Sequence, residues 1–176
     1  MHSSIACLFL TLLAVSANAA DEWTRFVDPV GNFTVEFQRL PRADTAVGTS
    51  LIGENVPITT YSVQNGSSVM MVVDAPILNR TPPFFEILEM VAKKILAGAS
   101  SINGIVQSDM PDLLDGQVGR RFEIKRTDGS LETLRMFDVN GHLYRLVTIT
   151  EGGNPARTED AIHFSESLRL IAQQQR

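Results

Sequence analysis

Three short turn signals, each ending in glycine, constrain the fold of this chain more than any other feature of its sequence. They are Asn65-Gly66, Asp128-Gly129 and Asn140-Gly141. A two-residue hairpin loop of type I′ requires a positive φ at both positions, and Asn, Asp and Gly tolerate that conformation best. Strand-like runs flank all three signals, so the chain is predicted to fold largely as antiparallel hairpins.

The residue pattern around these turns places the strands. Apolar and polar residues alternate strictly in residues 33–37, as in a strand with one buried face. The hairpin around Asn65-Gly66 has apolar residues on both faces, which predicts that both faces are covered. The predicted strands are residues 23–27, 33–37, a strand near 45–52, residues 56–63, 68–74 and those within 117–150.

Two segments change from the period of a strand to that of a helix. The first follows Thr81, has proline in its first turn, and continues to Gly98 with a charged side opposite its apolar side. The second begins at Asn154-Pro155 and continues to Leu168. These elements predict an α+β fold, with an antiparallel sheet of about six to nine strands and two main helices packed on it.

The turn signals at Asp128-Gly129 and Asn140-Gly141 also predict strand register. If both loops have two residues, Met136 lies in one row between Arg121 and Arg145. Asp138 is then diagonally near, on the same mixed face of charged and apolar side chains. The opposite face carries the predicted core residues, among them Val118, Phe122, Ile124, Phe137, Val139, Tyr144 and Leu146.

The mixed face defined by Arg121, Met136, Asp138 and Arg145 is the candidate binding surface. Two guanidinium groups can hold a carboxylate or a phosphate through paired hydrogen bonds. The alternative is structural, because cross-strand ion pairs are common in sheets and stabilise them by only about 0.2–1 kcal/mol each. The sequence leaves both interpretations open.

Catalysis has few candidate residues in this sequence. The chain has no G-x-S-x-G, H-E-x-x-H, phosphate-binding loop or G-x-G-x-x-G motif. His142 follows a hairpin turn, and His163 lies on the second predicted helix. A Ser–His–Asp site could still assemble in space, for example from Ser165 or Ser167, because such triads are defined by geometry. The chain is predicted to be non-catalytic, with that assembled site as the open alternative.

One acidic segment has a spacing that suggests a metal site. Asp109, Asp112 and Asp115 recur at every third residue, and oxygen-rich loops suit Ca²⁺. The spacing differs from that of an EF-hand, so the segment is interpreted as a solvated loop. No metal and no cofactor is predicted.

The charge balance of the chain bears on its partners. Fifteen basic and 20 acidic residues give a formal net charge of −5. Nucleic-acid binding usually requires a basic face, so this balance argues against a nucleic-acid partner.

The first twenty residues are predicted to contain an export signal. Residues 5–15 are almost wholly apolar, and small residues follow them up to Ala19. This apolar core is too short to span a bilayer, which takes about 20 residues. Cleavage is expected between Ala19 and Ala20. It would leave a single domain over residues 20–176 with no stable membrane anchor.

Cys7 is the only cysteine of the chain, and it lies within this leader. The mature domain is thus expected to lack disulfides, thiol nucleophiles and cysteine-bound metals. Its stability must then come from its core, for which its length is sufficient.

Two parts of the sequence resemble the PsbP-like family. Residues 139–147 (VNGHLYRLV), followed by residues 164–168 (FSESL), are similar to a strand and a helix end of that family. Residues 26–41 are similar to its opening hairpin. Leu168 stands where the family usually has an aromatic residue, and Gln38-Arg39 stands where a Phe-Pro break is commoner. The resemblance covers most of the mature chain.

The resemblance implies an α/β/α sandwich around an antiparallel sheet and a place among exported, non-catalytic proteins that dock onto larger assemblies. The expected function is therefore an exported protein-interaction or assembly factor, periplasmic or secreted, whose partner is an envelope protein or complex. The alternative is a small-ligand-binding or hydrolytic domain with a pocket between sheet and helix. Fold similarity alone does not choose between them.

Overall fold

The computed structural model describes residues 23–49, 54–66, 68–77, 83–101, 104–152 and 155–171. The predicted leader, its cleavage site and Cys7 lie outside these residues, as do Thr81 and Asn154 at the expected helix starts. Export and the limits of the mature domain therefore stay predictions.

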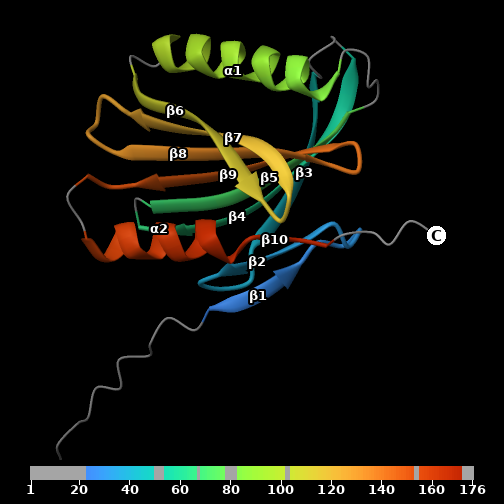
Figure 1. Cartoon of the computed structure of the whole chain (residues 1–176). Helices are drawn as coiled ribbons and strands as arrows, with labels where there is room; N and C mark the ends of the chain where they lie inside the picture. Colours follow the sequence, from blue (N-terminus) through green and yellow to red (C-terminus); the bar gives the residue numbers. More distant parts are fainter. Residues whose placement is uncertain are drawn as a thin grey trace, which may run out of the picture.

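Seven strands form an antiparallel main sheet (Figure 1). In sheet order they are β3 (Arg42–Thr49), β4 (Asn55–Asn65), β5 (Ser68–Pro76), β9 (His142–Thr150), β8 (Leu131–Val139), β7 (Gln117–Lys125) and β6 (Ile105–Leu114). Every strand lies beside a sequence neighbour, and β5 pairs with β9 at the centre. The main sheet thus consists of two meanders, β3-β4-β5 and β6-β7-β8-β9, joined side by side.

Three further strands form a smaller antiparallel sheet. Its order is β1 (Thr24–Val27), β2 (Phe33–Phe37) and β10 (Arg169–Leu170). The positions of β1 and β2 agree with the sequence pattern, but a single sheet was expected. The two strands instead form a separate sheet, because β2 pairs with the C-terminal segment β10 rather than with the main sheet.

Helices cover both faces of the main sheet (Figure 1). α1 (Phe84–Ser101) lies on one face, against β6 and β7. α2 (Pro155–Ser167) lies on the other face with the small sheet, and it contacts β2, β5 and β9. The predicted α+β fold, with two helices packed on antiparallel sheet, is confirmed. No helix within the described ranges is long and apolar enough to cross a bilayer.

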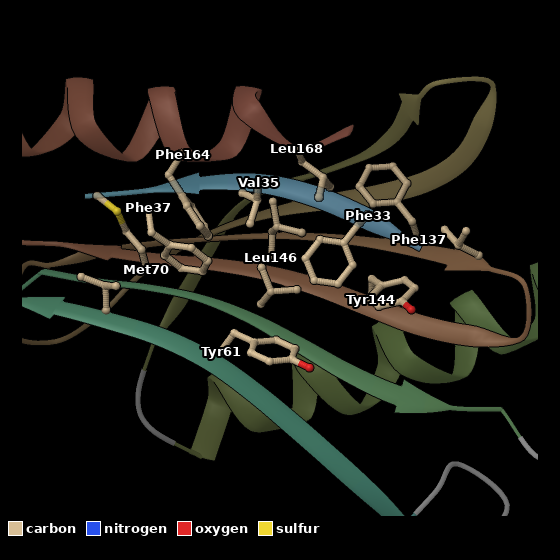
Figure 2. Close-up of a cluster of buried hydrophobic side chains, with 13 residues drawn as sticks. Phe33, Val35, Phe37, Tyr61, Met70, Phe137, Tyr144, Leu146, Phe164 and Leu168 are labelled. Carbon is tan, nitrogen blue, oxygen red and sulfur yellow. The ribbon is translucent and has the colours of Figure 1, made fainter. Parts of the chain in front are cut away.

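Two apolar cores fill the spaces between these layers. The first lies between the main sheet and the layer of α2 and the small sheet, where Phe33, Tyr144 and Phe164 are fully buried (Figure 2). The second lies beneath α1. β5 contributes to both cores, through Val72 to the first and Met71 to the second. The sequence pattern of the β4–β5 hairpin, with apolar residues on both faces, therefore predicted correctly that both faces of β5 are covered.

The turn between β8 and β9 has the predicted two-residue form. Asn140 has a φ of 55° and Gly141 a φ of 86°. Met136 pairs with Arg145 across this hairpin, as the two-residue loop requires. The register predicted for these two strands is confirmed.

The turn between β7 and β8 is one residue longer than predicted. Arg126 N donates a hydrogen bond to Ser130 O at 2.9 Å, and Gly129 N donates to Arg126 O at 3.0 Å. Gly129 has a φ of 83°. Residues 127–129 therefore form a three-residue loop, a type I turn followed by a left-handed glycine. Asp128 holds this loop by accepting a hydrogen bond from Ser130 N at 2.9 Å.

The additional loop residue shifts β7 by one position relative to β8, and such a shift exchanges the two faces of a strand. Arg120 pairs with Met136, and Arg121 pairs with Arg135. The predicted position of Arg121 beside Met136 is therefore wrong, and Arg120 lies there instead. Phe122 likewise joins the core beneath α1 and not the core on the other side.

β6 lies where a solvated loop was predicted. It pairs with β7 along the strand, with a register shift between Val106 and Ser108. Its turn is Asp115-Gly116, with φ values of 48° and 81°, which is a two-residue loop like the turn signals above. The loop prediction was wrong because an edge strand also exposes many polar side chains.

Both helices lie close to their predicted positions. Leu88 and Val91, from the predicted apolar side of α1, are buried against the main sheet. Phe164 on α2 and Leu168 directly after it are fully buried in the first core. Leu168 thus fills the core without the aromatic ring that the PsbP-like pattern usually has there.

Candidate functional site

The predicted binding residues do not share one open surface. Arg120, Met136 and Arg145 form a row across β7, β8 and β9, on the face that α1 covers. Met136 is fully buried there. Asp138 is half-buried on the same face, and its Oδ1 accepts a hydrogen bond from the backbone of the β8–β9 turn at 3.2 Å. The structure brings these residues together as a packing interface and leaves Arg121 on the opposite face.

Arg121 makes an ion pair within its own strand. Its Nη2 donates to Glu123 Oε1 at 2.8 Å, and both side chains are partly exposed. Its Nε is buried and has no hydrogen-bond partner among the described residues. An exposed pair of this kind contributes little to stability.

Arg120 takes the position predicted for Arg121, and carboxylates surround it. Its guanidinium donates to both oxygens of Asp109, at 2.6 and 2.8 Å, and to Glu89 of α1 at 2.5 Å. The hydrogen bond with Asp109 is the main cause that raises the pKa of Arg120. Arg120, on β7, therefore connects α1 to β6 through ion pairs with Glu89 and Asp109.

No carboxylate compensates the charge of Arg145 in this way among the described residues. Within the described part of the chain it forms no ion pair, and its Nε is buried without a hydrogen-bond partner. Burial between Val73 and Met136 lowers the pKa of its guanidinium. A desolvated charge without a partner costs stability. Arg145 is thus a buried charge without compensation on the face that α1 covers.

The three regularly spaced aspartates each have their own partner. Asp109 binds Arg120, and Asp112 accepts from Arg135 at 2.7 and 3.2 Å. Asp115 Oδ2 accepts from the backbone N of Leu170 at 2.8 Å. In the residues that the structure describes, no three acidic, His or Cys side chains gather as a metal site would need.

An open groove of about 420 Å³ lies between α2 and the small sheet. Strand alternation explains part of its lining, because Phe26 and Val35 face the core and leave Arg25 and Glu36 on the other face. Pairing of β10 with β2 adds Arg169. The polar lining residues are Arg25, Thr34, Glu36, His163, Glu166, Ser167 and Arg169.

His163 connects α2 to the small sheet along this groove. Its Nε2 lies 2.6 Å from Glu36 Oε2. Its ring stacks on Trp23, with the ring centroids 4.0 Å apart. Trp23 is the only tryptophan of the chain. The groove is therefore bordered by an aromatic pair whose indole can report on it.

Of the two serines considered for an assembled catalytic site, Ser167 has its hydroxyl bound to the backbone. Ser167 Oγ accepts from Glu36 N at 2.9 Å and donates to Phe164 O at 2.8 Å. Its proton is therefore held by a carbonyl, whereas an activated nucleophile donates to a base. Ser165 contributes its carbonyl O to Arg135 at 2.7 Å.

Two guanidinium groups in the groove keep unused donors. Arg25 is exposed and makes no hydrogen bond or ion pair with the described residues. Arg169 donates through Nη1 to the carbonyl oxygens of Glu166, at 2.5 Å, and Leu168, at 2.6 Å. Its Nε and Nη2 have no partner within the described ranges. The groove thus offers free N–H donors from two separate strands.

A second polar cluster joins the β1–β2 turn to the main sheet. Asn32 Nδ2 donates to the Tyr144 hydroxyl at 2.8 Å, and His142 Nδ1 lies 2.7 Å from Asp74 Oδ1. Asp28 is 3% exposed, and burial raises its pKa, with a smaller increase from the charge of Asp74. These side chains satisfy one another, so the cluster is a structural network.

The groove escaped sequence analysis because its residues come from both ends of the chain. Only the pairing of β10 with β2 brings Arg169 beside the strand that carries Glu36. One signal was present, since the alternation in β1 and β2 places Arg25 and Glu36 opposite the core residues. It indicates an outward face and not a groove.

Comparison with known proteins shows similarity of fold. The solution structure of cyanobacterial PsbP from Synechocystis sp. PCC 6803 aligns with a TM-score of 0.60 at 12% identity, covering 91% of this chain and 99% of that protein. A protein of unknown function from Pseudomonas aeruginosa aligns with a TM-score of 0.47 at 13% identity, covering 86% and 97%. No family model and no curated protein matches the sequence. The expected PsbP-like fold is confirmed, as fold alone.

Proposed function

We propose that this protein is an exported protein-interaction factor that acts by contact in the cell envelope and not by catalysis. The groove between α2 and the small sheet supports the interaction, because it presents free hydrogen-bond donors beside an aromatic pair. Convergent polar groups in a concave surface are the usual form of a binding site.

The state of the polar groups in the groove carries the proposal. A general base must be free to take a proton, and a nucleophile must be able to give one to it. Ser167 donates its proton to the backbone and not to His163, whereas Arg25 and Arg169 keep unused donors. This combination favours recognition over hydrolysis.

The leader supports the location. An apolar stretch over residues 5–15, followed by small residues up to Ala19, is the pattern of a cleaved export signal. The similarity to cyanobacterial PsbP supports the fold and brings neither a compartment nor a partner to this chain. We place the mature protein in the periplasm, in contact with an envelope protein.

A photo-crosslinking amino acid at Val27 tests the interaction. Val27 is 53% exposed and shares the outward face of β1 with Arg25. Val47, on the edge strand β3, is 76% exposed and provides the matched control. In cells that export the full chain, we expect one discrete crosslinked protein from position 27 and none from position 47.

The outcome at each position is decisive once export and folding of both variants have been verified. Equal crosslinking from both positions would show non-specific contact. No crosslink from position 27 would contradict the proposal that this groove binds a protein.

Binding of a small ligand is the second candidate, and the same groove favours it. Its volume of about 420 Å³ lies between a helix and a sheet, where such a pocket was expected. Native mass spectrometry of the exported protein separates the two candidates. A retained small molecule, together with an absence of crosslinked protein, would favour the ligand.

A further inference from the structure

We propose that the groove between α2 and the small sheet recognises acidic side chains of an extended partner segment, through Arg25 and Arg169. The inference rests on the proposed function, and it specifies the chemistry of the partner at that site. Its premise is that both guanidinium groups line one groove and keep N–H donors that no described residue uses.

Carboxylates are the natural acceptors for such donors. A guanidinium presents its N–H groups as a fork that matches a carboxylate, and charge-assisted hydrogen bonds are stronger than neutral ones. The groove carries two acids of its own. Glu36 is engaged by His163, and the side chain of Glu166 makes no ion pair with the described residues. The unused donors of Arg25 and Arg169 thus exceed what one remaining carboxylate can take up.

The spacing of the two arginines suits a segment that carries more than one acidic side chain. Arg25 lies on β1 and Arg169 on β10, with β2 between them. Neighbouring strands are about 4.8 Å apart, so these two backbones are about 10 Å apart. An extended chain advances about 3.4 Å per residue, so acidic residues two or three positions apart span a comparable distance. One partner segment can therefore meet both guanidinium groups.

Trp23 makes the binding directly measurable. It is the only tryptophan, and it stacks on His163 beside the groove. We would titrate the protein with a hexaglutamate peptide blocked at both ends, following indole fluorescence and, independently, calorimetric heat. We expect saturable binding that weakens with salt, and no binding of a blocked hexaglutamine peptide.

Substitutions assign the binding to the two arginines. Arg25→Gln and Arg169→Gln should each weaken the hexaglutamate affinity by about fivefold, as expected for exposed charge pairs. Arg42→Gln is the matched control, because Arg42 is an exposed arginine on β3, in the main sheet. It should leave the affinity unchanged. Thermal melting of each variant verifies that the fold is intact.

Several results would overturn the inference. They are equal weakening by Arg42→Gln, equal binding of hexaglutamine with a free carboxyl terminus, and complete competition by inorganic phosphate at equal concentration. A crosslinked partner at position 27, together with no response to hexaglutamate, would refute the acidic ligand and leave the proposed function standing. No crosslink from position 27, together with no response to hexaglutamate, would refute both the proposed function and the acidic ligand.

Discussion

Arg135 and Arg145 lie on neighbouring strands, face opposite sides of the main sheet, and differ in how their charges are compensated. Arg135 makes two hydrogen bonds with Asp112 and a third with the carbonyl of Ser165. It thereby connects β8 to β6 and α2. Arg145 has no ion pair within the described chain, and its Nε is buried alone. The same residue type is expected to stabilise at one position and not at the other.

Replacing each of these arginines with methionine tests that contrast. Arg135→Met leaves the half-buried carboxylate of Asp112 without its partner, so the free energy of unfolding should fall by about 1–3 kcal/mol. Arg145→Met removes an unpaired charge, so it should leave the free energy of unfolding unchanged or raise it by about 1 kcal/mol. Urea denaturation measures both. An equal loss at the two positions would mean that Arg145 has a counter-ion in solution.

Asp28 gives stability a dependence on pH. Burial raises its pKa in the folded state above the ordinary value of 3.8. The folded state therefore binds this proton more tightly than the unfolded state does. The stabilisation is complete below the unfolded pKa and is lost as the pH rises through the raised folded pKa.

Asp28→Asn removes this titration while its side-chain oxygen can still accept the hydrogen bond from Asn32 N. The variant should gain stability relative to the parent as the pH rises from about 4 through the raised folded-state pKa of Asp28. Melting curves across that range measure the difference. Asp44→Asn, on exposed β3, serves as the control. A difference between the Asp28 variant and the parent that stays constant with pH would contradict the prediction.

The β8–β9 loop requires glycine at its second position. Gly141 has a φ of 86°, where a side chain adds strain of about 1 kcal/mol or more. Gly141→Val should therefore lower the melting temperature. Gly98→Ala, within α1, should raise stability by about 0.5–1 kcal/mol, because alanine favours a helix interior and its Cβ meets nothing within 4 Å. Differential scanning calorimetry compares the two. An unchanged melting temperature for Gly141→Val would show that the loop relaxes freely.

The elements differ in how well their sequence specifies them. The β8–β9 register follows from Asn140-Gly141, because a two-residue loop permits one alignment. The β7–β8 register could not be predicted from Asp128-Gly129, because this signal suits a three-residue loop as well as a two-residue one. The additional loop residue determines which face of the sheet Arg121 occupies. β6 was missed although Asp115-Gly116 carries the same turn signal. Its aspartates suggested solvent, whereas Arg120 and Arg135 pair with two of them.

At the scale of the whole molecule, the layers could be predicted and the sites could not. Helical and strand periods specify which faces are apolar, and this was sufficient for helices packed on sheet. The groove depends on where the chain returns after α2, and no local pattern near Arg169 indicates its pairing with β2. At the predicted binding surface, the sequence indicated neither that Arg120 would lie beside Met136 nor that α1 would cover that face.

Export has a simple consequence for the whole protein. If the leader is removed after Ala19, the mature chain begins at Ala20 and contains no thiol, since Cys7 is the only cysteine. Its melting temperature should then be indifferent to reductants. Intact-mass measurement of exported protein locates the new terminus. Cys7 retained in the exported protein would contradict the predicted cleavage.

The pairing of β5 with β9 has a consequence for the order of folding. Val69 lies opposite Ile149, whereas the strands within each meander pair across short connections. Hairpins of that kind form within about 1–10 μs. Joining β5 to β9 requires closure of a loop that contains α1 and three strands, and its entropy cost is incurred before the contacts form. We therefore expect the two meanders to form early and separately, and their meeting along β5 and β9 to limit the rate of folding.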